Sequence, residues 1–280
     1  MSSMKISGTA DITHEGIKKH FTKWKKDPFQ PIIELIANGF DAGAKRVDVI
    51  VEQNELHGLE SVTVLDNGSG IDISQCDLHF SKFNESSKQG DDDAQGAHGK
   101  GRLAFHLLCS SASWFTKCQK SNSIIRIESQ KLRNFTAEDI GIGYQHALLN
   151  PMESGTCVVL KHFHENVPEV AAIKRRLESY FGWRLVLNPD RKLAINGIEV
   201  ETPECRVVEK EVLIEDVNFK IDFIRWINKP GDEKSYNYVV NNDGRILHRD
   251  FSSFNKKPFF ILAPTLDLTG LIISKKTIHL

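Results

Sequence analysis

The most constraining part of the sequence is residues 33–44, which read I-E-L-I-A-N-G-F-D-A-G-A. If these residues form a helix, Glu34, Asn38 and Asp41 share one face, because residues three and four apart lie one turn above another. The opposite, core-seeking face carries the apolar side chains of Ile33, Ile36, Ala37 and Phe40. Two carboxylates and an amide in line offer the hard oxygen ligands that suit a magnesium-bound phosphate.

A solvated polar face on a surface helix is the alternative interpretation of the same three residues. Gly39 inside the helix argues against it, because a glycine there costs roughly 0.5–1 kcal/mol relative to alanine. We expect the helix to run from about residue 30 to about residue 42. Gly43 would then end it, since glycine adopts the left-handed conformation common at helix C-termini.

The second informative segment is D-N-G-S-G-I at residues 66–71, directly after the apolar residues 62–65. A carboxylate at the end of a strand, here Asp66, can accept a hydrogen bond from an exocyclic amine. Gly68 and Gly70 would let the backbone approach a planar ligand. D-N-G is also strong turn chemistry, so this segment alone does not separate a plain turn from a ligand loop.

Two further segments are weaker signals. Residues 96–102, G-A-H-G-K-G-R, precede an expected buried helix over residues 103–109. Backbone N–H groups at a glycine-rich helix start can bind phosphate, although a flexible connector has the same composition and the segment is no Walker A sequence. Gly155-Thr156 precedes an expected strand over residues 157–161, where the threonine hydroxyl could support the carboxylate or a base edge.

The remaining pattern predicts an α+β protein with two domains, residues 1–200 and residues 201–280. In the first, we expect helices over residues 15–26 and 168–180, and a lid or disordered segment over residues 72–100. The second is predicted to be smaller and α+β or mostly β, with a hairpin turn at N-D-G, residues 242–244. Apolar patterning continues to residue 280, so we expect a fragment of a longer protein. Further strands are expected at residues 46–52, 61–65, 113–117, 124–128, 209–214, 219–227, 236–240 and 259–262.

Composition narrows the function classes. Lys and Arg total 36 against 37 Asp and Glu, a net charge of −1, so bulk charge gives no support to nucleic-acid binding. No run of about 18 apolar residues is present, and we expect no membrane association. The five cysteines never stand in a C-x-x-C spacing, which disfavours a disulfide framework or zinc site and suits the cytoplasm.

In their order and spacing the four segments resemble the motifs of the GHKL ATPases, the superfamily of gyrase B subunits, Hsp-type chaperones, histidine kinases and MutL. Residues 33–44 are similar to the N-box, residues 66–71 to the G1 box, residues 96–102 to the G2 box, and residues 154–160 to the last motif. The resemblance covers roughly residues 10–190. It implies the Bergerat fold, a two-layer α/β sandwich that binds the nucleotide between its helices and a mobile lid, here about residues 80–98. A smaller α+β domain, similar to a transducer domain and mostly β, would follow.

The resemblance implies ATP and Mg²⁺ as ligands. Glu34 would be the general base, Asn38 would bind Mg²⁺, and Asp66 would accept from the adenine amino group. A lysine of the second domain often reaches the γ-phosphate in this superfamily, and Lys256, Lys257, Lys275 and Lys276 are the candidates. Further nucleotide contacts are implied for Asp41, Gly68, Gly70, Ile71, Ser87, Lys88, Gly96, His98, Gly99, Lys100, Gly101, Arg102 and Thr156.

The resemblance therefore implies slow, Mg²⁺-dependent ATP hydrolysis that acts as a conformational switch and drives homodimerisation. D-A-G-A at residues 41–44 is the form found in MutL and MORC proteins, whereas histidine kinases lack it, and we expect no kinase activity. Residues 160–168 are similar to a MutL segment, but Glu169-Val170 departs from the Ala-Arg that follows there. Residues 226–247 resemble instead MORC-like and chaperone-like proteins.

Two alternatives stay open. One is an ATP-dependent interaction module without useful hydrolysis. The other is a DNA-associated ATPase of MutL or MORC type, for which the basic residues 18–26 and 174–176 would be the support, although a solvated helix face explains both clusters. The sequence names neither the pathway nor a protein partner.

Overall fold

The computed structural model describes residues 4–9, 13, 15–16, 21, 27–56, 58–76, 80, 101–119, 121–164, 169–202, 204–214, 217–227, 237–240, 246–250 and 259–264. These residues form two compact units, one reaching Thr202 and the other beginning at Glu204. Among the described residues, no helix combines the length and the apolar character that crossing a membrane requires.

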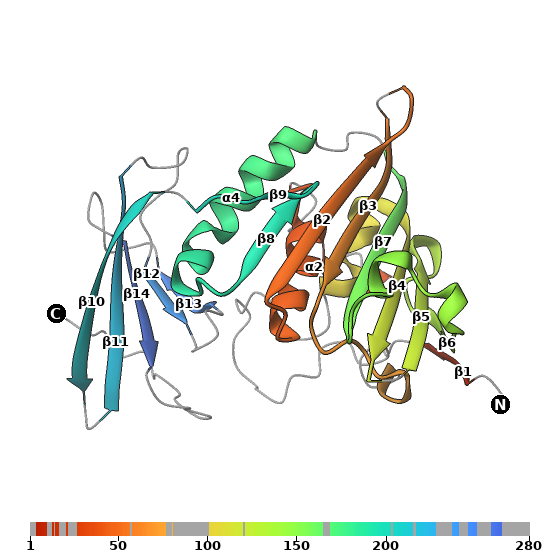
Figure 1. Ribbon diagram of the computed structural model, residues 1–280, viewed down its shortest axis with the longest axis horizontal. Coiled ribbons are helices and arrows are strands. Elements are labelled where there is room, and N and C mark those ends of the chain that lie inside the picture. The colour runs from red at the N-terminus through yellow and green to blue at the C-terminus, as the bar shows by residue number, and fades with distance from the viewer. Residues whose placement is uncertain are drawn as a thin grey trace. The chain divides into compact units, whose positions relative to one another are not determined.

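A mixed sheet runs through the whole first unit, in the order β1-β6-β5-β4-β7-β3-β2-β8-β9 (Figure 1). All neighbouring strands are antiparallel except β2 and β8, which are parallel. The strands are β1 (Lys5–Thr9), β2 (Arg46–Gln53), β3 (Leu59–Asp66), β4 (Cys109–Cys118), β5 (Ser121–Glu128), β6 (Asn134–Asp139), β7 (Gly155–Phe163), β8 (Lys192–Ile195) and β9 (Ile198–Glu199).

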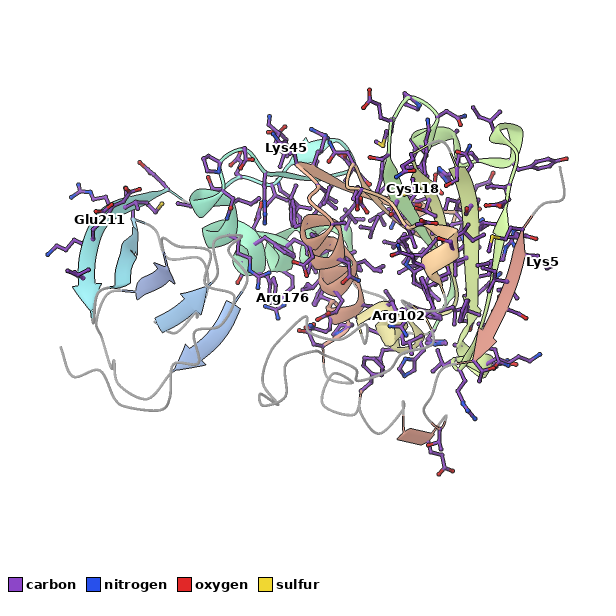
Figure 2. The ribbon with its side chains drawn as sticks, turned by 90° about the horizontal axis from the view of Figure 1, so that it is seen from below. Lys5, Lys45, Arg102, Cys118, Arg176 and Glu211 are labelled. Carbon is purple, nitrogen blue, oxygen red and sulfur yellow. The ribbon has the colours of Figure 1, made fainter. Side chains whose placement is uncertain are left out.

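The α-helices described in this unit are α2 (Gln30–Asp41) and α4 (Val170–Leu187), which lie on the same side of the sheet (Figures 1 and 2). The helix predicted over residues 30–42 is confirmed, and Gly43 follows it at φ 79°. Short 3₁₀ helices complete the unit: η2 (Ile73–Gln75), η3 (Gly101–Leu107), η4 (Ser129–Lys131), η5 (Ile142–Tyr144) and η6 (Ala147–Leu149).

Two predicted helices have different bounds in the structure. The helix expected over residues 103–109 is the 3₁₀ helix η3, and Cys109 already begins β4. The helix expected over residues 168–180 begins at Val170 and continues to Leu187. Most of the helix expected over residues 15–26 lies outside the described residues, as do its basic side chains and most of the expected lid.

Alternation along the central strands buries both faces of the sheet. In β7, Val158 and Leu160 belong to the large core that also contains α2 and α4, whereas Cys157 and Val159 point to the other face. On that second face they pack with Leu65, Leu149, Phe115, Leu148 and Met152. The residues around η6 therefore cover the back of β3 and β7, and the end of β3 is held between two packed layers.

The second unit contains one sheet in the order β10-β11-β14-β12-β13. Its strands are β10 (Cys205–Ile214), β11 (Val217–Trp226), β12 (Asn237–Val240), β13 (Ile246–Asp250) and β14 (Phe259–Pro264). All four strands predicted here are present, and β13 is additional. The predicted N-D-G turn lies outside the described residues, between the antiparallel strands β12 and β13. Taken over both units, the α+β class is confirmed.

Candidate functional site

The centre of the candidate site is the contact between α2 and the end of β3. A Cβ atom built on Gly39 would lie 2.9 Å from the Cβ of Asp66 and 3.2 Å from Cγ2 of Val47. Any side chain at position 39 would push the helix away from the strand. Gly39 therefore lets α2 come within direct backbone contact of Asp66, which explains a glycine inside a helix.

Asp66, the last residue of β3, is only 6% exposed. Its Oδ1 accepts a hydrogen bond of 2.8 Å from the backbone N–H of Gly68. Burial raises the pKa of Asp66 to about 6, although backbone hydrogen bonds from Gly68 and Thr156 act in the opposite direction. A buried carboxylate gains most from a further donor, because its lost hydration has to be replaced by hydrogen bonds. Asp66 is thus suited to bind a neutral N–H group of a ligand.

The loop after Asp66 is fixed to the C-terminal end of α2. Asn67 Oδ1 accepts hydrogen bonds from the backbone N–H groups of both Lys45 and Arg46, each at 2.9 Å. The backbone N–H of Ser69 donates to the carbonyl of Ala42 at 3.0 Å. These contacts leave little freedom for the turn between Asp66 and Gly70.

The same loop is fixed to the sheet on its other side. The backbone N–H of Ile71 donates to Thr116 Oγ1 at 2.7 Å, and this buried hydroxyl donates to the carbonyl of Gly155 at 3.4 Å. Ser154 Oγ donates to the carbonyl of Gly68 at 2.7 Å. Asp66 pairs with Thr156 in the β3–β7 register, so strand pairing brings the predicted second and fourth segments together.

Two glycines of these segments are required by close contacts. At Gly155, φ is 150° and a Cβ would lie 2.3 Å from the carbonyl oxygen of Asp66. At Gly70, φ is 72° and a Cβ would lie 2.2 Å from the carbonyl oxygen of Lys117. The segment 66–71 is therefore more than a plain turn, because Gly70 seats it against Lys117 of β4 and Gly155 of β7 lies against the carbonyl of Asp66.

Glu34 is 4% exposed, whereas Asn38 and Asp41 on the same helix are exposed. Its Oε1 accepts a hydrogen bond of 2.7 Å from Nε2 of Gln30. The alternative interpretation, a solvated polar helix face, is thus wrong at Glu34. The sequence pattern predicts one apolar and one polar face, but every residue from Gln30 to Ile36 is buried, so the first half of the helix is covered on all sides. The buried carboxylate of Glu34 can accept a proton, and the exposed side-chain oxygens of Asn38 and Asp41 can bind a metal ion that holds a phosphate beside it.

Arg102 and Gly101 are the described members of the glycine-rich segment. Gly101 begins η3, which packs against α2. Arg102, labelled in Figure 2, is buried, and its Nη2 donates to the carbonyl of Phe80 at 2.9 Å. Burial lowers the pKa of Arg102 to about 10. The predicted contacts Ser87, Lys88, Gly96, His98, Gly99 and Lys100, and the four candidate lysines, lie outside the described residues.

Four side chains that support the site were not predicted from the sequence. Asn67 and Ser154 stand inside segments that were singled out, so their position was available but their hydrogen bonds were not. Gln30 and Thr116 had no such signal. Their contacts with Glu34 and Ile71 depend on the burial of α2 and on the pairing of β4 with β7.

Residues 27–156 match the family described as histidine kinase-, DNA gyrase B- and HSP90-like ATPase. Curated relatives are DNA mismatch repair proteins MutL. The protein of Buchnera aphidicola is 28% identical over 191 residues, 60% of this chain and 30% of the relative. That of Pediococcus pentosaceus is 38% identical over 55 residues, 20% of this chain and 8% of the relative. That of Staphylococcus aureus strain Newman is 36% identical over 66 residues, which are 24% of this chain and 9% of the relative. The chain thus spans less than a third of the length of these relatives.

Proposed function

Because residues 27–156 match the histidine kinase-, DNA gyrase B- and HSP90-like ATPase family, which belongs to the GHKL superfamily, we propose that this chain binds ATP with Mg²⁺ and hydrolyses it slowly. The single observation that carries the proposal is the buried carboxylate of Asp66, held between Gly39 and Gly68 at the end of β3. The adenine amino group donates to this carboxylate. Gly68 and Gly70, whose missing side chains let the loop pack against the carbonyls of Ala42 and Lys117, keep the loop backbone beside the flat base. Ile71 and Thr156 border it.

The phosphates lie toward the exposed end of the polar face of α2. Asn38 presents a carboxamide oxygen there, and Asp41 a carboxylate one turn further on. Such hard oxygens fit Mg²⁺, which commonly takes one or two protein ligands and completes its shell with phosphates and water. Asn38 would hold the ion, which neutralises phosphate charge when bound. The backbone N–H groups of Gly101 and Arg102 would face the phosphates with the rest of the glycine-rich segment, while the Arg102 side chain donates to the Phe80 carbonyl.

Hydrolysis then proceeds by attack of water on the terminal phosphorus, with cleavage of the bond to the bridging oxygen of ADP. Glu34 orients this water and accepts its proton, so that the products are ADP and phosphate. The burial of Glu34 supports this role, because a carboxylate removed from bulk water keeps its basicity for a positioned donor.

ATP acts in this proposal as a switch. Nucleotide binding drives homodimerisation, and the domain made by residues 1–200 transmits its state to the transducer-like domain made by residues 201–280. We place this activity in the cytoplasm. Turnover is slow, because lid closure and dimerisation precede the chemical step.

A role on DNA is the second candidate, and it takes its support from the names of the MutL relatives. In the basic cluster 174–176 of α4, Lys174 and Arg176 add little to it. Nζ of Lys174 lies 3.6 Å from Oε1 of Glu178. Nη2 of Arg176, a residue labelled in Figure 2, lies 2.9 Å from Oδ2 of Asp27. Both cations are thus paired within the chain. Retention on DNA that falls steeply with salt would favour this role, since each phosphate contact releases counterions.

Hydrolysis is tested by comparing the wild type with Glu34→Ala in a phosphate-release assay with Mg²⁺-ATP. We expect the variant to lose hydrolysis while its affinity for a non-hydrolysable ATP analogue stays close to that of the wild type. A Glu34→Ala protein that hydrolyses ATP at the wild-type rate would overturn the assignment of the base. Binding without hydrolysis in the wild type would instead favour the interaction module.

A further inference from the structure

Gln30 and Glu34 form a buried hydrogen-bonded pair on successive turns of α2. Nε2 of Gln30 donates to Oε1 of Glu34 at 2.7 Å. Gln30 is 6% exposed and Glu34 is 4% exposed. An ionised carboxylate can accept hydrogen bonds but cannot donate them, so the Gln30 amide has to turn its NH₂ group toward Glu34.

Burial makes this pair different from an ordinary surface pair four residues apart. On an exposed helix face, water replaces a lost partner and such pairs contribute little. At Glu34 bulk solvent has scarcely any access, and an ionised carboxylate in such a place depends on the donors that the protein supplies. The Gln30 amide therefore bears directly on the direction and the charge of the Glu34 side chain.

The surrounding contacts hold Gln30 and Glu34 in a fixed frame. Arg176 of α4 forms an ion pair with Asp27 at 2.9 Å, and Asp27 Oδ1 accepts from the backbone N–H of Phe29, just before α2 begins. Burial raises the pKa of Tyr180, the guanidinium groups of Arg184 and Arg176 act in the opposite direction, and the charge of Glu34 adds to the rise. The Tyr180 hydroxyl is thus within electrostatic reach of Glu34 and of both arginines. Helix α4 thus fixes the start of α2 and also borders the carboxylate.

We propose that Gln30 is a positioning residue for hydrolysis, which holds the Glu34 carboxylate ionised and directed for accepting a proton from water. The inference rests on the proposed function, because it assigns to Gln30 a role that acts only through Glu34. No group on Gln30 has to touch the nucleotide or the water.

Two substitutions at position 30 test this role by opposite means. Gln30→Met keeps the length of the side chain and removes the donor. Gln30→Glu keeps the shape and places a second carboxylate against Glu34, and two such groups in contact share a proton rather than both ionise. Gln130→Met, at an exposed position of η4, makes the same glutamine-to-methionine change outside the site.

The experiment measures steady-state hydrolysis of Mg²⁺-ATP from mildly acidic to mildly basic pH, with thermal unfolding of each protein. For Gln30→Met we expect kcat to fall about 10-fold to 100-fold, the loss typical of a hydrogen bond to a charged group, with KM changed less than about twofold. In Gln30→Glu the acidic limb of the kcat profile moves to higher pH. Gln130→Met keeps the wild-type profile.

The outcomes separate this inference from the proposed function. If the wild type hydrolyses ATP, Glu34→Ala does not, and both Gln30 variants keep the wild-type kcat and pH profile, the role of Gln30 is wrong and the proposed function stands. If the wild type shows no hydrolysis, or Glu34→Ala retains it, the proposed function fails and the inference falls with it. If Gln30→Met does not fold, the pH profile of Gln30→Glu decides. An unchanged profile there overturns the inference.

Discussion

Gly39 on α2 and Asp66 at the end of β3 face each other so closely that a Cβ on Gly39 would lie 2.9 Å from the Cβ of Asp66. This contact joins the helix that carries Glu34 and Asn38 to the strand that carries the buried carboxylate. The spacing between the two candidate segments therefore depends on the absence of a side chain at one position.

Replacing Gly39 by alanine is expected to destabilise the protein. Alanine favours a helix interior by roughly 0.5–1 kcal/mol, but forcing a methyl group into a filled space costs about 1–3 kcal/mol, and Asp66 Cβ is a fixed neighbour. We expect a net loss of about 1–2 kcal/mol in urea unfolding and weaker binding of an ATP analogue. Gly143→Ala is the control, since nothing lies within 4 Å of a Cβ there. Equal stability of the two variants would contradict the close contact.

The main elements of the fold could be predicted where the pattern is local. The sequences of α2, β2, β3, β5 and β7 each show the periodicity of their element, and the predicted bounds lie close to those in the structure. β1 was not predicted, because Lys5–Thr9 is short, half exposed and defined by pairing with residues 134–138. η3 was expected to be an α-helix because its run of apolar residues is compatible with either kind of turn.

The site was predictable only in part. Glu34 and Asp66 follow from motif order, and the approach of α2 to the end of β3 follows once these two elements are known to pack. The burial of Glu34 was not predictable, since a polar helix face ordinarily meets water. The support of the loop by Thr116 comes from β4, whose place beside β7 is set by long-range pairing.

Asp66→Asn is expected to stabilise the ligand-free protein at neutral pH. Burial raises the pKa of Asp66 from 3.8 to about 6, so this group adds stability below pH 3.8 that is lost as the pH rises through about 6. The shift of about two units corresponds to about 3 kcal/mol. The asparagine variant escapes this cost, so its advantage in urea unfolding should be largest above pH 6 and shrink toward pH 4. An advantage that does not change with pH would show that the charge of Asp66 is not its cause.

Thr116→Val is expected to weaken both the fold and nucleotide binding. The variant leaves the partly buried backbone N–H of Ile71 without its acceptor, at a cost of about 1 kcal/mol or more. Thr116→Ser keeps the hydroxyl and should retain most of the stability and affinity. Chemical unfolding and analogue titration of the two variants give the comparison. If valine and serine behave alike, the hydroxyl does not support the loop.

Asn67→Ala is expected to act mainly on the loop. The Asn67 side chain accepts from two backbone N–H groups, those of Lys45 and Arg46, but its position is exposed and water can replace part of the interaction. We expect a loss of about 1 kcal/mol in stability and a larger relative loss in affinity for the ATP analogue. Hydrogen exchange of the Lys45 and Arg46 amides, unchanged in the variant, would contradict this role.

The central claim is that the Asp66 site binds ATP together with Mg²⁺. Calorimetric titration with a non-hydrolysable ATP analogue, with and without Mg²⁺, on the wild type and on folded Asp66→Asn, tests it most directly. We predict binding to the wild type that is strengthened by Mg²⁺ and lost in Asp66→Asn. Equal binding by the two proteins, or none by the folded wild type, would contradict the account.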